Sequence, residues 1–344
     1  MAENSALFRF DADAATGGGH AMRCLTLAET LETAGWTCQF AVGPGTLDTV
    51  VALAGRAGDC IELPGDVIGQ PDAMAGAMVD GCDVLIVDHY GWSMAEETPC
   101  RDFAGRILVI DDLADRPHDC DILLDQSLGR RAADYTNLVP DRCKVLVGPA
   151  FALLKPAFVE LREATLQRRA ISRLERILIT FGLTDPDNLT GRALDALADA
   201  GWDGATDVIL GGGAPHLATV LETVEKIDMP VDVIVDADDM AGPMAAADMA
   251  IGACGTTSWE RCCLGLPTMT LTAAENQRGI ADALMDAGAV IGLGWHGNVD
   301  AARMALEIRG LMRGPERLQA VSAAAAEICD GGGAHRMMEE IGHD

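Results

Sequence analysis

His20 is the residue whose type and surroundings in the sequence most directly suggest chemistry. It follows the glycines 17–19, which lie between a β-rich run at 7–10 (LFRF) and a helical pattern at 20–34. A glycine-rich turn lets the backbone approach a phosphate or a sugar closely, and a helix start favours negative charge. An imidazole there can take a proton from water near neutral pH. We therefore predict that His20 is a general base and that Gly17 and Gly19 contact the substrate.

Two alternatives for this turn must be weighed. A histidine that caps or packs against the helix would show the same spacing, so the turn taken by itself leaves that role open. Dinucleotide binding is less favoured, because residues 17–22 read GGGHAM and lack the third glycine of the GxGxxG fingerprint.

A second segment whose residues could bind a substrate lies at 252–267 (GACGTTSWERCCLGLP). Small and hydroxyl-bearing residues between a strand and a helix offer N–H and O–H groups that can hold a diphosphate. Glu260, one turn into the helix, can accept hydrogen bonds from a ribose diol. A plain helix cap with an acidic first turn is the alternative, and the same holds for Asn276 and Gln277 at the start of the next helix.

The elements that must position these residues alternate between β-rich runs and Ala/Leu-rich helical stretches, a rhythm that builds parallel sheets. The runs are 7–10, 38–42, 83–88, 106–111, 121–125 and 144–150, followed by 176–182, 207–213, 231–235, 249–253 and 268–272. An arginine-rich stretch at 152–175 separates the two series, so we predict two Rossmann-like domains, 1–160 and 161–344. Ligands of such sheets bind beyond the carboxyl ends of the strands, and two domains facing one another would form a cleft there.

Composition limits the partners. The sequence has 25 Lys and Arg against 53 Asp and Glu, a formal net charge of −28, which argues against nucleic acid or an anionic membrane as a partner. The N-terminus (MAENSALFRF) does not read as a leader and no apolar run reaches membrane-spanning length, so we expect a cytoplasmic protein. The eleven cysteines lie mostly in apolar stretches without CxxC or zinc spacing, which predicts reduced thiols and no structural metal.

Several segments, taken in order, resemble the UDP-2,4-diacetamido-2,4,6-trideoxy-β-L-altropyranose hydrolases of pseudaminic acid biosynthesis, which are related to the glycosyltransferase that makes lipid II. The resemblance runs over nearly the whole chain. The segments that carry it are GGGHAMRCLTLAETL (17–31), LIVDHYGW (85–92), IDDLADRPHDCDILLDQ (110–126), NLVP (137–140), GPAFALLKPAF (148–158), FGLTDPDNLT (181–190), GTTSWERCCLGLP (255–267) and ENQ (275–277).

The resemblance implies a GT-B-like pair of Rossmann-like domains, with UDP held mostly by the C-terminal domain. His20 matches the catalytic histidine of that family, and Glu260 matches the glutamate expected on the uridine ribose. The other residues that it implies in substrate binding are Tyr90, Thr184, Asp185, Thr256, Thr257, Ser258, Asn276 and Gln277. No metal and no cofactor are expected.

The reaction that the resemblance implies is attack of water on the anomeric carbon of a small UDP-amino sugar, with inversion and with UDP as the leaving group. A UDP-sugar glycosyltransferase of the same fold and an inactive nucleotide-sugar-binding module are the alternatives. Three residues depart from the expected pattern, namely Leu183, Phe151 and Ser127. The substituents of the sugar are therefore left open, and the residues do not indicate an oligomeric state.

Overall fold

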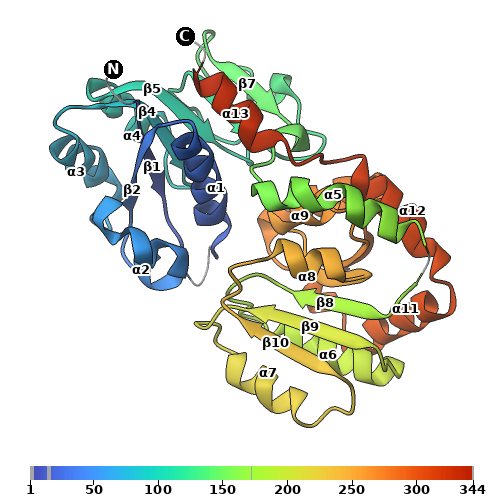
Figure 1. The fold of residues 1–344 in the computed structure, drawn as a ribbon. Coiled ribbons are helices and arrows are strands. Elements are labelled where there is room, and N and C mark those ends of the chain that lie inside the picture. The colour runs from blue at the N-terminus through green and yellow to red at the C-terminus, as the bar shows by residue number, and fades with distance from the viewer. Residues whose placement is uncertain (1–3, 14–16, 172, 343–344) are drawn as a thin grey trace. The chain divides into compact units, whose positions relative to one another are not determined.

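The computed structural model describes residues 4–13, 17–171 and 173–342. The chain divides into two compact units, the first comprising Met1–Leu154 with Gly332–Asp344 and the second Lys155–Gly331. Each unit is built around its own parallel β-sheet, with helices against the sheet faces (Figure 1).

Within the described residues, the first unit forms a seven-stranded sheet in the order β3-β2-β1-β4-β5-β6-β7, with every neighbouring pair parallel. The strands are β1 (Ser5–Phe10), β2 (Thr37–Val42), β3 (Cys60–Glu62), β4 (Cys82–Asp88), β5 (Ala104–Ile110), β6 (Ile122–Asp125) and β7 (Lys144–Val147). The strand order reverses between β1 and β4, which makes the carboxyl ends of these two strands the topological switch point of the sheet.

Side chains of the first sheet alternate between two cores. Phe8 and Ile86 pack on one face with α1 (Gly19–Thr33) and α13 (Gly333–Gly342), whereas Leu7 and Leu85 pack on the other face. Both faces are covered, so the central strands are apolar at nearly every position, as parallel sheets require. The remaining helices of this unit are the short α2 (Thr46–Thr49), α3 (Gln70–Ala77) and α4 (Met94–Glu97).

The described part of the second unit forms a six-stranded parallel sheet in the order β10-β9-β8-β11-β12-β13. Its strands are β8 (Arg176–Thr180), β9 (Ala205–Leu210), β10 (Val231–Val235), β11 (Met249–Ala253), β12 (Thr268–Thr272) and β13 (Ile291–Trp295). Numbered from the start of each unit, the six strands of this sheet have the order 3-2-1-4-5-6, which is also the order of the first six strands of the seven-stranded sheet. The second switch point therefore lies between β8 and β11.

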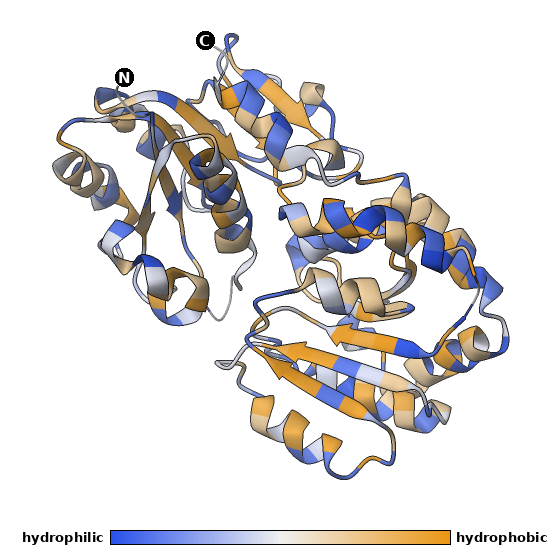
Figure 2. Ribbon diagram, in the orientation of Figure 1, coloured by the Kyte–Doolittle hydropathy of each residue, from blue (hydrophilic) through white to orange (hydrophobic). Residues whose placement is uncertain are grey.

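The helices of the second unit cover its sheet, and the strands of both sheets are mostly hydrophobic in Figure 2. They are α5 (Pro156–Arg169), α6 (Leu189–Ala200), α7 (Leu217–Val224), α8 (Ala241–Ala246), α9 (Thr257–Cys263), α10 (Arg278–Asp286), α11 (Ala301–Arg313) and α12 (Glu316–Ala326). In the described part of the chain, no helix is both long enough and apolar enough to cross a membrane.

The arginines of α5 bind carbonyl groups at the ends of other helices. Arg162 donates to the carbonyls of Cys263 and Ala326, and Arg169 donates to the carbonyl of Met244 at 2.6 Å. The last carbonyls of a helix lack intrahelical partners and carry partial negative charge, so guanidinium groups are favourable there. These contacts join α5 to α8, α9 and α12 and explain why a connector between two sheets is so rich in arginine.

The two units differ from the predicted domains at both ends of the second domain. The predicted boundary at 160/161 falls inside α5, which the structure keeps whole within the second unit. The segment Gly332–Asp344 groups with the first unit, because Met337 and Ile341 of α13 are buried in the same core as α1. A pattern of apolar residues predicts that a helix has a buried face, but it does not say which sheet covers that face.

Candidate functional site

The switch point of the first sheet carries the candidate base. His20 is the second residue of α1, which follows β1, and it is buried with 8% of its surface exposed. Its Nδ1 lies 2.9 Å from Asp88 Oδ1 and 3.1 Å from the carbonyl oxygen of Asp88, the last residue of β4. Both neighbours are acceptors, so Nδ1 carries the proton. In the neutral ring, Nε2 is then the nitrogen with the free lone pair, as a general base requires.

The charge of Asp88 changes the basicity of His20. Burial lowers the pKa of His20, but the nearby Asp88 carboxylate and its hydrogen bond more than offset this, so the pKa is raised above 6.5. A raised pKa makes the ring a stronger base and leaves more of it protonated at a given pH. His20 can therefore act as a base only as the pH rises through this raised value.

Asp88 itself is fully buried and satisfied by partners. Arg23 donates from Nε to Oδ2 at 2.5 Å and from Nη2 to Oδ1 at 2.6 Å. Burial would raise the pKa of Asp88, but Arg23 and His20 hold it well below its usual range. Asp88 therefore stays ionised and can stabilise a protonated His20.

A second carboxylate completes this cluster. Asp112 follows β5, and its Oδ2 lies 3.3 Å from Arg23 Nη1 and accepts a hydrogen bond from the Tyr90 hydroxyl at 3.3 Å. The Tyr90 ring meets His20 edge-on, with ring centroids 4.6 Å apart and planes at 79°. The structure thus brings together the predicted residues His20 and Tyr90, together with three charged residues that sequence reasoning did not single out.

His89 lies at the same edge of the first sheet, but both of its ring nitrogens form local hydrogen bonds. Its Nε2 is 3.0 Å from Asp11 Oδ2, and its Nδ1 accepts from the backbone N–H of Gly91 at 3.0 Å. Asp11 also accepts from Arg9 and from the backbone N–H of Gly43. Both ring nitrogens of His89 are engaged in shaping the loop before and after Tyr90, which leaves neither available as a base in this arrangement.

The predicted glycines have local roles in the turn before α1. Gly17 has a φ of +72°, a conformation that favours glycine, and its N–H donates to the Asp13 carbonyl at 2.8 Å. Gly19 is the first residue of α1. The middle of the turn, 14–16, lies outside the described residues. Contact of Gly17 and Gly19 with a substrate stays a prediction.

The switch point of the second sheet carries small residues in place of charged ones. Thr256 precedes α9, and Thr257 is the first residue of this helix. The first N–H groups of a helix have no intrahelical acceptor and can bind an anion. Ser258 differs, because its hydroxyl accepts from Arg261 Nη2 at 3.1 Å and its N–H donates to the Gly255 carbonyl at 2.9 Å. A direct contact of Ser258 with a diphosphate stays a prediction.

Glu260, in the first turn of α9, is the unusual group beside this second loop. Its Oε2 is buried and has no hydrogen-bond partner among the described residues. Burial raises the pKa of Glu260 to about 7, although the positive charges of Arg261 and Lys155 act in the opposite direction. An acceptor that is buried and unsatisfied costs stability, which is typical of a group reserved for a ligand.

Asn276 and Gln277 lie in the 3₁₀ turn Glu275–Gln277, beyond β12. Gln277 Oε1 accepts from the backbone N–H of Ala273 at 3.0 Å, and its Nε2 is 3.8 Å from the position that a Cβ of Gly255 would occupy. The structure therefore brings Gln277 to the loop that contains Thr256 and Thr257.

Asp185 stabilises the start of α6. Its two carboxylate oxygens accept from the backbone N–H groups of Leu189 and Thr190 at 2.9 and 2.8 Å, where α6 begins. Asp185 is almost fully buried and has a φ of +38°. Thr184 lies beside it in the same loop and is half-buried. The predicted contacts of both residues with a substrate stay predictions.

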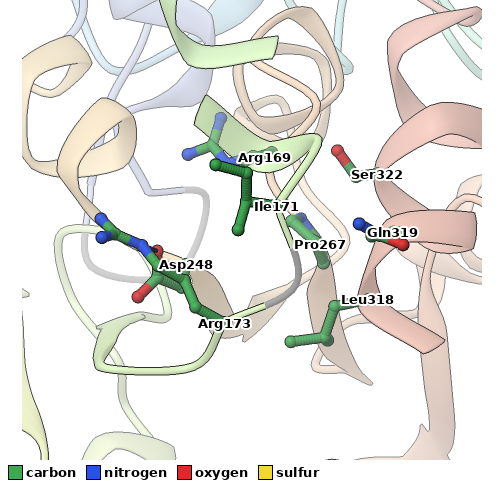
Figure 3. A pocket seen from close by; sticks show the side chains of 8 residues that line it. All are labelled: Arg169, Ile171, Arg173, Asp248, Pro267, Leu318, Gln319 and Ser322. Carbon is green, nitrogen blue, oxygen red and sulfur yellow. Dashed lines mark hydrogen bonds and ion pairs between the residues drawn. The ribbon is translucent and has the colours of Figure 1, made fainter. Parts of the chain in front are cut away.

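The hollows found within the second unit do not coincide with these loops. Figure 3 shows the side chains that line a small cavity, among them Arg173, Asp248 and Pro267. Each of these three residues precedes a strand, so the cavity lies at the amino ends of the sheet. Its volume of about 10 Å³ is too small for a sugar nucleotide. A wider hollow of about 390 Å³ borders Arg192 and His296 beyond β13. Across the described residues, no three His, Cys, Asp or Glu side chains are grouped as a metal site would need.

Three residues of the first cluster were missed by sequence reasoning, namely Arg23, Asp88 and Asp112. A signal existed for two of them. Arg23 lies three residues after His20, a spacing that places both on one face of a helix, and Asp88 ends an apolar strand. What the sequence lacked was the strand order, which makes β4 the neighbour of β1.

Comparison with known proteins first defines the architecture. The crystal structure of MurG from Acinetobacter baumannii superposes with a TM-score of 0.68 at 14% identity, covering 98% of this chain and 99% of that one. The fold is therefore GT-B-like, with two parallel α/β sheets, and the predicted fold class is confirmed. No protein-family model matches the sequence.

Two known proteins are similar to the chain in sequence. The spore coat polysaccharide biosynthesis protein SpsG of Bacillus subtilis (strain 168) is 32% identical over 164 residues, which is 45% of each chain. The UDP-2,4-diacetamido-2,4,6-trideoxy-beta-L-altropyranose hydrolase of Campylobacter jejuni subsp. jejuni serotype O:2 is 25% identical over 288 residues, covering 82% of this chain and 96% of that protein. The second similarity thus extends over both units.

Proposed function

We propose that the protein is a nucleotide-sugar-processing enzyme that hydrolyses UDP-2,4-diacetamido-2,4,6-trideoxy-β-L-altropyranose, or a close UDP-amino sugar, to UDP and the free sugar. The observation that carries the proposal is the pairing of His20 Nδ1 with the ionised, buried Asp88, which leaves Nε2 as a base. The similarity to a hydrolase of this substrate over 82% of the chain supports it.

In the proposed reaction, His20 Nε2 takes a proton from water while the water oxygen bonds to the anomeric carbon. The bond between that carbon and the diphosphate oxygen breaks, and UDP leaves with the electron pair. Attack from the opposite side inverts the anomeric centre. Asp88 stabilises the imidazolium that forms, and a positioned general base of this kind contributes roughly 10²–10⁴-fold to the rate.

Residues beside His20 can serve recognition of the sugar. Asp112 Oδ1 is buried and has no hydrogen-bond partner among the described residues, while Oδ2 is held by Arg23 and Tyr90. An acetamido group of the substrate carries an N–H, which is the donor that such an oxygen lacks. We assign Tyr90 and Asp112 to binding of an acylated amino sugar.

The second unit is proposed to bind the nucleotide. Glu260 accepts hydrogen bonds from the ribose hydroxyls, since its buried Oε2 has no hydrogen-bond partner in the part of the chain that the structure describes. The N–H groups at Thr256 and Thr257 bind the diphosphate, aided by the positive end of the helix dipole. Local N–H donors suit a chain with a net charge of −28, because a polyanionic substrate finds little general attraction there.

Product analysis tests the proposal. The protein is incubated with a panel of UDP-linked diacetamido sugars without any acceptor, and proton NMR follows the sugar anomers and UDP. We expect free sugar of inverted configuration, and in ¹⁸O water we expect the label on the sugar. Label on UDP would overturn carbon–oxygen cleavage.

Variants assign the base. His20→Gln should keep UDP binding and lose roughly 10²–10⁴-fold in turnover. His335→Gln is the matched control, because His335 is an exposed histidine of α13 in the same unit. Unchanged turnover in His20→Gln would overturn the assignment. Release of UDP only when an acceptor is added would identify a glycosyltransferase, and UDP-sugar binding without any turnover would identify a binding module.

A further inference from the structure

Two cysteines of the first unit lie next to each other, at the end of the sheet opposite to the candidate site. Cys120 precedes β6 and Cys143 precedes β7, so both lie at the amino ends of neighbouring strands, opposite to the edge that carries His20. Their Sγ atoms are 3.5 Å apart. Disulfide formation brings two sulfur atoms to about 2 Å, so a shift of about 1.5 Å is sufficient here.

The two thiols differ in exposure and in acidity. Cys120 is fully buried, whereas Cys143 is half-buried and accessible to a small oxidant. The hydrogen bond between the two sulfurs lowers the pKa of Cys143, while the same bond together with burial raises the pKa of Cys120. The accessible sulfur therefore has the greater thiolate character, and the buried one keeps its proton.

Charged neighbours add to this asymmetry. Arg142 directly precedes Cys143 and forms ion pairs with Asp119 and Asp121, which flank Cys120. The positive charge of Arg142 lowers the pKa of Cys143, although Asp121 raises it. A partly exposed thiolate beside a second thiol is the arrangement found at redox-responsive cysteines.

We propose that Cys120 and Cys143 form a reversible disulfide when the protein meets a peroxide. The Cys143 thiolate attacks hydrogen peroxide, the O–O bond breaks, and sulfenic acid and hydroxide form. The Cys120 sulfur then attacks the Cys143 sulfur, its proton leaves with the hydroxyl as water, and the disulfide results. Two thiols are oxidised by two electrons and one peroxide is reduced. A dithiol reductant reverses the step.

The crosslink would connect the last two strands of the first sheet. Strand β7 is an edge strand, paired with β6 on one side within the described residues. A disulfide closes the segment 120–143, which contains Tyr135, and removes conformational freedom from its unfolded state. We expect the first unit of the oxidised protein to melt roughly 5–10 °C higher than that of the reduced protein. This inference does not depend on the proposed reaction.

Peptide mapping of the folded protein tests the pair. The protein is treated with hydrogen peroxide, quenched, alkylated and cut with trypsin, which cleaves between the two cysteines after Arg130, Arg131 and Arg142. A disulfide would join two peptides that otherwise separate, and dithiothreitol would release them. Cys60 is the internal control, because it is also half-buried but its thiol donates to the Arg56 carbonyl and burial raises its pKa.

Variants decide between a specific pair and general oxidation. Cys143→Ser and Cys120→Ser should each abolish the crosslink and the gain in melting temperature, whereas Cys60→Ser should retain both. In Cys120→Ser we expect a dimedone-reactive sulfenic acid on Cys143. A folded protein in which peroxide modifies Cys60 as fast as Cys143, or in which the crosslink forms only after unfolding, would overturn the proposal.

Discussion

The two sheets share the order of their first six strands, yet different kinds of residues lie at their switch points. At the first, His20, Arg23 and Asp88 form a buried set of charges in which the carboxylate is satisfied from several sides. At the second, Thr256 and Thr257 begin a short helix, and Glu260 keeps a buried oxygen without a partner among the described residues. The same topology thus carries one site that is already paired and one that is not.

This difference is consistent with the proposed roles of the two units, catalysis in the first and nucleotide binding in the second. Groups that must transfer a proton need fixed partners, because their pKa and tautomer depend on them. Groups that bind a ligand can be left unsatisfied in the free protein, since the ligand supplies the missing hydrogen bonds. We therefore expect variants of the first switch point to change turnover and variants of the second to change affinity.

Asp88→Asn tests the first half of this comparison and should have the largest effect. Without the carboxylate charge, protonated His20 is no longer stabilised, and the neutral ring is no longer held with its proton on Nδ1. We expect turnover to fall by roughly 10²–10⁴-fold while UDP affinity is retained. In the wild type the rate should rise with pH through a pKa above 6.5, and in the variant this rise should move to lower pH.

Folding must be controlled in that experiment, because Asp88→Asn leaves Arg23 buried with a weaker partner. Near-UV circular dichroism and UDP binding show whether both units stay intact. Asp59→Asn serves as the matched control, since Asp59 is an exposed carboxylate in the same unit with a long contact to Arg56. A variant that is folded and keeps its turnover would remove Asp88 from the proposed mechanism.

Glu260→Gln tests the second half of the comparison. We expect it to weaken UDP binding and to stabilise the free protein. Loss of a charged acceptor should weaken UDP binding roughly 10–100-fold with little change in turnover at saturation. The free protein should become more stable, because burial raises the pKa of Glu260 from 4.5 to about 7. A group with a raised folded pKa costs stability increasingly as pH rises from the unfolded to the folded value, here up to about 3 kcal/mol.

Urea unfolding at pH 5 and pH 8 and calorimetric titration with UDP measure both effects. The gain in stability should be large at pH 8 and small at pH 5. Glu222→Gln on α7 is the control, because Glu222 is exposed and pairs loosely with Lys226. Weaker binding with no gain in stability at pH 8 would mean that Glu260 is not strained in the free protein.

Much of the fold could be predicted from periodicity, and the failures have physical causes. The runs at 249–253 and 268–272 match β11 and β12 in full, because buried parallel strands are apolar throughout. Strand β3 was missed since it has three residues, and β13 was missed because its sequence IGLGW contains two glycines. The partner of α13 depends on contacts far apart in the sequence, which local patterns do not contain.

The candidate site was predictable only where chemistry is local. His20 stood out through the glycines beside it, whereas the role of Asp88 depends on strand order and on the buried fork of Arg23. His89 shows the converse. In the sequence it is as plausible a base as any histidine after a strand, and only its two hydrogen bonds show that both nitrogens are in use.

Asp185→Ala is the smallest and most discriminating test of the comparison. The carboxylate caps α6 through Leu189 and Thr190, so its loss should cost about 1–2 kcal/mol in the free energy of unfolding. A purely structural role leaves the KM for the UDP-sugar unchanged, whereas the predicted contact with the substrate requires the KM to rise. Asp300→Ala is the matched cap on α11, exposed and bonded to the Arg303 N–H, and should cost less. Urea unfolding and steady-state kinetics at 25 °C separate the outcomes. A raised KM with unchanged stability would instead make Asp185 a ligand-binding residue of the second switch point.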